Sequence, residues 1–294
     1  MKLTAQHLTK TIGEKKVLSQ VEFSWQTGEI VGLVGRNGAG KTTLMRTLVD
    51  QYHADHGQVA IDDQDLTAVP EARQQLIYID PTEVFFARLT LAKLGRLYAL
   101  GYPTFDQARY RSLLADNDLV LAQRYGELSK GYQALVVMAL NLASAVPLIL
   151  LDEPFDGLDL FIREMIVKAV IDEVADGQRG FLIASHDLAE LDGLADRVLF
   201  LKRGTISKTV TLEAVRDEAA KLQLVFPAMQ IPAAVRQYGQ ILNVQGRVIT
   251  ALFSPYTAAV EAALTAEQPV LIEKLPLSLS DLFRSEYAEE VHHD

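Results

Sequence analysis

The feature that most constrains this chain is the stretch Gly35-Arg36-Asn37-Gly38-Ala39-Gly40-Lys41-Thr42-Thr43. An apolar run, Ile30 to Val34, precedes it and a helix-like segment, Leu44 to Val49, follows. The spacing G-x-x-x-x-G-K-[ST] in this context predicts a phosphate-binding loop. Successive backbone N–H groups would point at phosphate oxygens, and the helix that begins near Lys41 would add the positive end of its dipole. The alternative is a strand-to-helix turn that merely tolerates glycine, but a chance match to this spacing is expected only on the order of 1% of the time.

Two side chains of this loop are expected to act directly on a nucleotide. Lys41 can reach the β- and γ-phosphates, and the Thr42 hydroxyl can ligate Mg²⁺. A nucleoside triphosphate with Mg²⁺ is therefore the expected ligand of this loop. The predicted nucleotide-binding positions within the loop are Gly35, Asn37, Gly38, Ala39, Gly40, Lys41, Thr42 and Thr43.

The composition limits the remaining function classes. The chain has 294 residues, which is enough for one large domain or two ordinary ones. A net charge of −10 argues against nucleic acid as the main partner, because phosphate contacts need clustered lysines and arginines. Cysteine is absent, so the chain has no disulfide framework, thiol nucleophile or zinc-thiolate site. The first seven residues carry no apolar signal-peptide core.

One segment imitates a membrane span. Residues Ala134 to Leu151 carry no charge, but Asn141, Ser144 and Pro147 interrupt the run. We expect a buried helix to about Ala145 and then a buried strand, Leu148 to Leu151. A soluble chain is therefore expected, with any membrane role exerted through a partner.

The order of elements predicts an α/β fold. Residues 1–30 are expected to be β-rich, with Val17, Ser19, Val21, Phe23 and Trp25 on one strand face. After the glycine loop we expect a helix to about Tyr52, then strands, and a helical insertion at about residues 85–145. Strands Leu148–Leu151, Phe181–Ser185 and Arg197–Leu201 follow, the first two joined by a helix over Leu160–Ala175. This alternation predicts a mostly parallel sheet with nucleotide at the carboxyl ends of its strands.

The last eighty residues have a different order of strand and helix patterns from the rest of the chain. Strand and helix patterns follow in the order βαββαβ from Lys221 to Lys274, with a further helix over Leu279–Tyr287. This order predicts a small ferredoxin-like α+β domain over residues 216–294, after a first domain over residues 1–215.

Two acids follow the buried strand Leu148–Leu151. Asp152 is suited to holding Mg²⁺, directly or through water. Glu153 is the next residue, and its side chain is expected to point away from that of Asp152, so that it could polarise an attacking water. The competing interpretation is a strand that ends in a polar turn, and the glycine loop upstream makes it the weaker one. Leu128-Ser129-Lys130-Gly131-Tyr132 is, by itself, only a capped helix start, in which Ser129 and Gly131 could also meet an anion.

Taken together, these motifs resemble the nucleotide-binding subunit of an ATP-binding cassette (ABC) transporter. The resemblance covers about residues 1–215. Gly35–Thr43 is similar to the Walker A loop, Leu128–Tyr132 to the family signature L-S-G-G-Q, and Leu148–Glu153 to Walker B with its catalytic glutamate. Gly157-Leu158-Asp159 resembles the D-loop, and His186 stands where the family has its switch histidine.

The resemblance implies a mechanism and partners. Two cassettes would pair head to tail around two ATP molecules, with Ser129 and Gly131 of one chain touching the γ-phosphate held by the other. Glu153 would orient the water and His186 would contact the γ-phosphate, so that Glu153, His186 and Lys41 are the expected catalytic residues. Thr42 and Asp152 are the expected metal ligands. The resemblance also implies a separate membrane permease and a cytoplasmic chain that is peripheral at the inner face of the cell membrane.

Five positions depart from the family pattern. Ile12 stands where an aromatic residue usually stacks on adenine, which predicts weak discrimination for that base. Pro81 stands where a glutamine usually senses Mg²⁺, so either Asp80 or Glu83 could substitute, or both could be solvated turn residues. Lys130, Tyr132 and Asp156 replace common residues without removing an essential charge. A competent, slow ATPase is therefore expected.

Function remains open between three hypotheses. The leading one is an ATP-hydrolysing motor of an exporter, because Leu277–Phe283 is similar to the closing motif of drug- and peptide-exporting cassettes. A soluble ABC protein acting on ribosomes or DNA is disfavoured by the single Walker A loop and by the absence of sustained heptads. The third is a nucleotide-gated regulatory module whose C-terminal part binds a ligand.

Two histidines, His53 and His56, are three positions apart near the end of the first helix. The sequence shows no third metal ligand beside them, so a metal site is not expected there.

Overall fold

The computed structural model describes residues 1–79, 84–213 and 218–282. The chain divides into two compact units, residues 1–209 and 210–294. Within the described residues, no helix is both long enough and apolar enough to cross a membrane. The stretch that imitates a span consists instead of most of the helix α5 (Lys130–Ala143), followed by the short strand β7 (Leu148–Asp152).

The first unit begins with a four-stranded antiparallel sheet of order β2-β1-β4-β5. Its long strands alternate buried and exposed residues, which is the pattern of a sheet with one face on a core. Leu3, Leu8 and Trp25 are buried on that face. The strands are β1 (Lys2–Ile12), β2 (Lys15–Gln26), β4 (His56–Ile61) and β5 (Gln64–Asp65).

A second sheet of six strands has the order β10-β9-β3-β8-β7-β6. The pairs β3/β8, β3/β9, β7/β8 and β6/β7 are parallel, as the alternation of strands and helices predicts. Every residue of β3 and of β8 is buried, which is typical of strands covered on both faces. The strands are β3 (Ile30–Val34), β6 (Leu76–Tyr78), β7 (Leu148–Asp152), β8 (Gly180–Ser185), β9 (Arg197–Lys202) and β10 (Thr205–Thr211).

The register of this sheet places three loops together. Val34 pairs with Ser185, and Asp152 pairs with Ala184, so the carboxyl ends of β3, β7 and β8 lie at the same edge. The glycine loop, Glu153 and His186 follow these three strands directly. Both sheets contribute to one core, in which Trp25, Leu33 and Leu150 belong to the same buried cluster.

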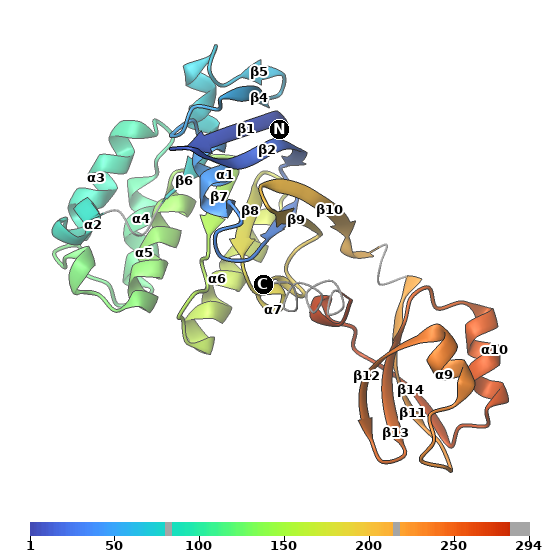
Figure 1. The fold of residues 1–294 in the computed structure, drawn as a ribbon. Coiled ribbons are helices and arrows are strands. Elements are labelled where there is room, and N and C mark those ends of the chain that lie inside the picture. The colour runs from blue at the N-terminus through green and yellow to red at the C-terminus, as the bar shows by residue number, and fades with distance from the viewer. Residues whose placement is uncertain (80–83, 214–217, 283–294) are drawn as a thin grey trace. The chain divides into compact units, whose positions relative to one another are not determined.

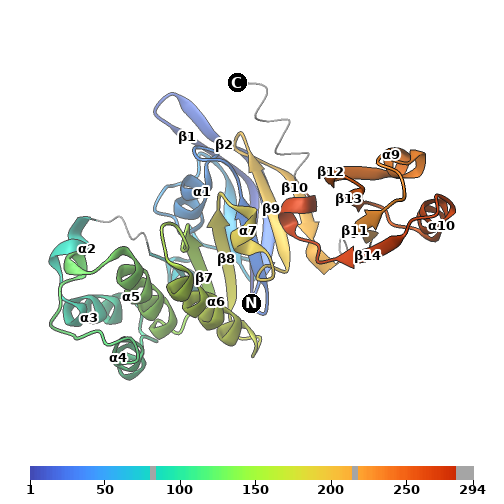
Figure 2. The same ribbon diagram turned by 90° about the horizontal axis from the view of Figure 1, so that it is seen from below.

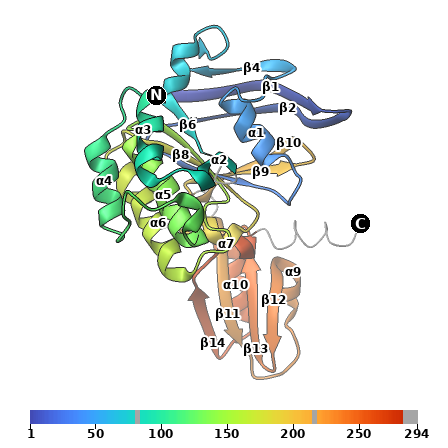
Figure 3. The same ribbon diagram turned by 90° about the vertical axis from the view of Figure 1, so that its left-hand side faces the viewer.

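Helices surround the parallel sheet. In Figures 1 and 2, α2 to α5 gather on one side of the unit, next to α6, and in Figure 3 this side faces the viewer. Capping side chains begin most of the longer helices: Thr90, Asp106, Ser129 and Asp159 each accept a backbone N–H bond. The helices are α1 (Lys41–Leu48), α2 (Val84–Arg88), α3 (Leu91–Gly101), α4 (Gln107–Ala115), α5 (Lys130–Ala143), α6 (Leu160–Val174) and α7 (Leu188–Leu191).

The second unit has the chain order βαββαβ. Its sheet has the strand order β12-β13-β11-β14 with antiparallel neighbours, which is the topology of a ferredoxin-like fold. Both helices pack on one face of this sheet, as Figure 1 shows, over a core that includes Leu224, Val235, Phe253 and Leu264. The elements are β11 (Ala220–Val225), α9 (Ala233–Tyr238), β12 (Gly239–Gln245), β13 (Val248–Phe253), α10 (Ala258–Ala266) and β14 (Leu271–Leu275).

The predicted face of β2 is wrong in its first half. Leu18 is fully buried, whereas Val17 and Ser19 are only half-buried. The cause is a β-bulge: Leu8 pairs with Val21 and Lys10 with Leu18, so β2 has one extra residue in this interval. Gln20 takes a φ of 51° there. The alternation therefore holds only from Val21 onward.

Other boundaries differ as well. The first helix ends at Leu48 and not near Tyr52, because Asp50 takes a left-handed φ of 58° and its buried carboxylate binds Arg73 and His53. Strand β10 and the single turn α7 were not predicted, because each is too short or too polar to show a periodic pattern. The helix predicted over residues 279–287 lies partly outside the described residues.

Candidate functional site

The glycine loop turns tightly between β3 and α1. Gly38 and Gly40 take φ values of 81° and 110°, which L side chains rarely adopt. A Cβ on Gly35 would lie 2.6 Å from the carbonyl oxygen of Leu201, so the backbone of β9 leaves no room for a side chain there. The loop thus brings its N–H groups to the start of α1, where a helix dipole favours an anion.

Lys41 is held inside this loop. Its Nζ donates to the carbonyl oxygen of Gly35 at 2.6 Å and lies 3.0 Å from Oε1 of Glu153. The side chain is only 6% exposed, so the charge is desolvated and compensated by these oxygens. An ammonium group so placed is prepared to receive a more highly charged anion.

Thr42 and Asp152 form the adjacent pair. The Thr42 hydroxyl donates to Oδ2 of Asp152 at 2.7 Å, and the hydroxyl of Tyr78 donates to the same oxygen at 3.2 Å. Burial raises the pKa of Asp152, and the two hydroxyl groups oppose that change. Oδ1 of Asp152 is buried and, in the part of the chain that the structure describes, has no hydrogen-bond partner.

Glu153 leaves the strand in an unusual backbone conformation. Its φ is 47°, while its N–H still donates to the carbonyl oxygen of Ala184 at 2.9 Å. A left-handed φ at a non-glycine residue costs free energy and is often found at functional sites. Here it turns the carboxylate toward Lys41 on one side and His186 on the other, where Oε2 lies 2.8 Å from Nδ1.

His186 responds to this carboxylate. The hydrogen bond with Glu153 is the main reason why the pKa of His186 is raised above 6.5, and burial only partly opposes it. The backbone N–H of His186 also donates to Oε2 of Glu153, at 3.3 Å. The structure therefore places Lys41, Glu153 and His186 in one connected cluster, next to Thr42 and Asp152. Their chemical roles stay predictions.

The other predicted site residues lie elsewhere. Ser129 is the N-cap of α5 and its hydroxyl accepts from the N–H of Tyr132, and Gly131 lies in the first turn, against Ile162. Ile12 is the last residue of β1 and is 44% exposed. Asp80, Pro81 and Glu83, the candidates for the missing glutamine, lie outside the described residues.

Two features of the site escaped sequence reasoning. Tyr78 lies within an apolar run, and no motif marks it as a partner of Asp152. The side chain of Lys130 reaches the D-loop-like segment, where a Cβ on Gly157 would lie 3.7 Å from Nζ. A cavity of about 420 Å³ lies between the glycine-loop site and α5. Thr42, Asp152 and Glu153 line it on the side of the site. Lys130, Val137 and Met138 of α5 are among its other lining residues.

This geometry defines a class of protein. The site combines a glycine loop between a buried strand and a helix, an enclosed lysine, and an acid that ends β7, one strand beyond β8, beside the loop threonine. Together these features form a P-loop nucleotide-binding site. Comparison with known proteins agrees with this class: residues 18–156 match the ABC transporter family.

Several individual members of this family are similar to the chain. The chain is 30% identical to the ABC transporter ATP-binding protein YtrB of Bacillus subtilis, over 95% of this chain and 96% of that one. It is 32% identical to the lipopolysaccharide export ATP-binding protein LptB of Escherichia coli, over 74% and 95% of the two chains. It is 30% identical to the sulfate/thiosulfate import ATP-binding protein CysA of Burkholderia mallei, over 74% and 64%. A solved ATP-binding subunit of an ABC transporter superposes with a TM-score of 0.66 at 30% identity, over 74% and 92% of the two chains.

The chain therefore belongs to the ATP-binding proteins of ABC transporters. It is a P-loop ATPase of the class whose hydrolysis is coupled to transport. Among the relatives are an importer and an exporter component, so family membership leaves the direction of transport open.

Proposed function

We propose that this chain is the motor subunit of an exporter, and that it hydrolyses Mg²⁺-ATP to drive a separate membrane permease. The observation that carries the proposal is the position of the Glu153 carboxylate, which lies between Lys41 and His186 at 3.0 and 2.8 Å. An acid, a phosphate-binding cation and a titratable imidazole within contact of one another are what hydrolysis of a phosphoanhydride requires.

Mg²⁺ suits the oxygen atoms next to this cluster. The buried Oδ1 of Asp152 lacks a partner among the described residues, and the Thr42 hydroxyl lies against the other oxygen of the same carboxylate. Hard oxygen ligands of this kind are those that Mg²⁺ prefers. Thr42 and Asp152 would hold the ion, which supplies positive charge to the phosphate oxygens when it is bound.

The residues of the chain then share the work of hydrolysis. Lys41 exchanges its contact with Glu153 for the phosphates of ATP and stabilises their charge. Glu153 orients a water molecule and accepts its proton as the oxygen attacks the γ-phosphorus. The bond from the γ-phosphorus to the bridging oxygen breaks, ADP leaves with the electron pair, and His186 contacts the phosphate that forms.

A second chain completes the site in this proposal. Ser129 and Gly131 lie at the start of α5 and not in the Lys41 cluster. In a head-to-tail pair they would reach the γ-phosphate held by the partner's loop, so that ATP joins the chains and hydrolysis separates them. The working unit is a pair of such chains on a permease at the cytoplasmic face of the membrane, with residues 1–215 as the cassette and 216–294 as an accessory domain.

Export is the finer part of the proposal. It is supported by the similarity of Leu277–Phe283 to the closing motif of exporting cassettes and by the likeness to LptB, an export component. Identification of the membrane protein that co-purifies with the chain gives the cargo class. Sealed vesicles with ATP on the outside then test direction: cargo that accumulates inside supports export, and cargo that is lost from inside indicates import.

Hydrolysis by Glu153 is tested on the purified chain. Glu153→Gln keeps the shape of the side chain but removes the base, so phosphate release from Mg²⁺-ATP is expected to fall by about 10²–10⁴-fold while ATP still binds. Glu164→Gln, an exposed glutamate on α6, is the matched control and keeps the wild-type rate. A Glu153→Gln variant with full activity would contradict the assigned role. If ATP hydrolysis is lost but cargo movement through the permease is unchanged, the motor hypothesis is wrong and a nucleotide-gated regulator is favoured.

A further inference from the structure

Helix α5 connects two distant places in the first unit. Its N-cap is Ser129, and Gly131 lies in its first turn. The helix has 14 residues, and at 1.5 Å per residue it is about 20 Å long. Because the helix is rigid, contacts that fix its carboxyl end also fix the position and orientation of Ser129 and Gly131 at its start.

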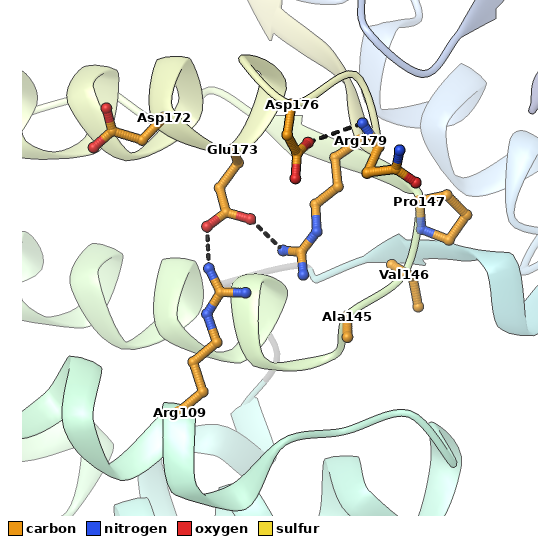
Figure 4. Close-up of a pocket in the computed structure, with 9 residues that line it drawn as sticks. Arg109, Ala145, Val146, Pro147, Asp172, Glu173, Asp176 and Arg179 are labelled. Atoms are coloured by element: carbon orange, nitrogen blue, oxygen red, sulfur yellow. Dashed lines mark hydrogen bonds and ion pairs between the residues drawn. The ribbon is translucent and has the colours of Figure 1, made fainter.

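Three charged side chains from three separate segments meet near that carboxyl end. Arg109 comes from α4, Glu173 from α6, and Arg179 from the residue before β8. Figure 4 shows the two guanidinium groups pointing at the two oxygens of the one carboxylate. Oε1 of Glu173 pairs with Nη2 of Arg109, and Oε2 lies 2.7 Å from Nη1 of Arg179.

Arg179 also contacts α5 itself. Its Nη1 donates to the carbonyl oxygen of Leu142, in the last turn of α5, at 3.1 Å. Carbonyl groups in a last turn lack intrahelical partners, and a cation there is favoured by the helix dipole. The next carbonyl, that of Ala143, accepts from the N–H of Asp106 at 2.7 Å, next to the start of α4. The end of α5 is thus bound to α4 and to the strand β8.

The carboxylate of Glu173 compensates the positive charges of Arg109 and Arg179. The side chains of Glu173 and Arg179 are 14% and 11% exposed, so little solvent screens them. Burial lowers the pKa of Arg179, the carboxylate of Glu173 opposes that effect, and the charge of Arg109 adds to it. Without the carboxylate, two guanidinium groups would face each other in a partly buried cavity of about 400 Å³.

We infer that Glu173 is a positioning residue for ATP hydrolysis: it holds Arg109 and Arg179 together and so fixes the orientation of α5, which presents Ser129 and Gly131 to the partner chain. The inference rests on the proposed function, in which these two residues complete the partner's site. A small rotation at the anchored end is carried along the helix to its start. Displacement of a reacting group by about 1 Å can cost on the order of 100-fold in rate.

The test measures two quantities for the purified full-length wild type and for each variant: the Kd for ATP and the kcat for Mg²⁺-ATP hydrolysis. The Glu173→Gln variant keeps an intact glycine loop, so its Kd is expected to stay within about twofold of the wild-type value. Its kcat is expected to fall by about tenfold or more. Glu173→Asp retains the charge and is expected to recover part of the rate. Arg109→Gln releases only α4, and it is expected to lower kcat in the same direction by a smaller factor.

Asp172→Asn is the matched control. Asp172 lines the same cavity, precedes Glu173 on α6, pairs with Lys168 and points away from both arginines in Figure 4. Its variant is expected to keep wild-type kcat and Kd. The inference is overturned if Glu173→Gln keeps kcat within twofold of wild type, or if Kd rises in step with the loss of kcat, as general damage to the fold would cause. Hydrolysis at the full rate per chain at concentrations where the wild-type protein is a monomer, also with Mg²⁺-ATP bound, would instead contradict the proposed two-chain site.

Discussion

Oε2 of Glu153 lies 2.8 Å from Nδ1 of His186, and this contact joins the end of β7 to the end of β8. The carboxylate accepts a hydrogen bond from the imidazole, and this bond is the main reason why the pKa of His186 is raised. The pair is therefore sensitive to pH in the absence of nucleotide.

The first prediction concerns this titration. The hydrogen bond with Glu153 raises the pKa of His186 above 6.5, so the bond contributes to stability below that pH and is lost as the pH rises through the raised value. An NMR titration of the imidazole should give a midpoint above 6.5 in the wild type and a lower one in Glu153→Gln. A midpoint that does not move in the variant would show that Glu153 is not the cause.

The second prediction concerns the approach of β9 to the glycine loop. A methyl group on Gly35 would lie 2.6 Å from the carbonyl oxygen of Leu201, which belongs to the backbone of a buried strand. Gly35→Ala should lower the free energy of unfolding by about 1–3 kcal/mol, as overpacking of a core does. Urea unfolding measures the change.

Gly101→Ala is the control for that substitution. Gly101 ends α3, and a Cβ there would meet nothing within 4 Å. Alanine should leave stability unchanged or raise it by up to about 1 kcal/mol. If Gly35→Ala were as stable as Gly101→Ala, the loop would have more room than the structure shows.

The third prediction concerns the second unit. Oδ2 of Asp281 accepts from Nζ of Lys221 at 2.8 Å and from the hydroxyl of Ser278 at 2.7 Å. Burial acts to raise the pKa of Asp281, but these hydrogen bonds outweigh it and the pKa lies below 3.8. The carboxylate therefore stabilises the unit above pH 3.8, and the contribution is lost as the pH falls through the lowered pKa.

Asp281→Asn should accordingly destabilise the unit at pH 7 by about 1.5–3 kcal/mol, the range for hydrogen bonds to a charged group. Hydrogen exchange of the β11 amides reports the opening free energy of this unit alone. The difference from wild type should shrink when the measurement is repeated at a pH below 3.8. Glu273→Gln, at an exposed position on β14, should cause no change at either pH. A difference that persists in acid would mean that the carboxylate charge is not what stabilises the unit.

The fourth prediction concerns the base of the nucleotide. Ile12 ends β1 and is 44% exposed, where the family usually has an aromatic ring. Ile12→Tyr should tighten ATP binding by about 1–3 kcal/mol through stacking. Calorimetric titration with ATP and GTP measures the gain, and Glu14→Tyr in the neighbouring turn is the control. If the affinity for both nucleotides were unchanged, position 12 would not contact the base.

Much of the site could be predicted from sequence because its residues follow strands. The glycine loop that carries Lys41, the acid Asp152 and His186 each follow an apolar run, and parallel pairing brings the ends of these runs to one edge of the sheet. The ion pair between Arg109 and Glu173 could not be predicted, since these residues are 64 positions apart and meet only because their helices pack together. The bulge that buries Leu18 depends on the left-handed φ of Gln20, which the alternating pattern of β2 does not show.

The central claim is that each hydrolytic site needs the glycine loop of one chain and the start of α5 of another. It is tested most directly by mixing two inactive variants, Lys41→Ala and Ser129→Ala, and measuring phosphate release from Mg²⁺-ATP. In a mixed pair, the loop of the Ser129→Ala chain meets the intact Ser129 of its partner. Random pairing of equal amounts in a two-fold dimer should restore about a quarter of the wild-type rate. A mixture no more active than the mean of the two separate variants would contradict the account.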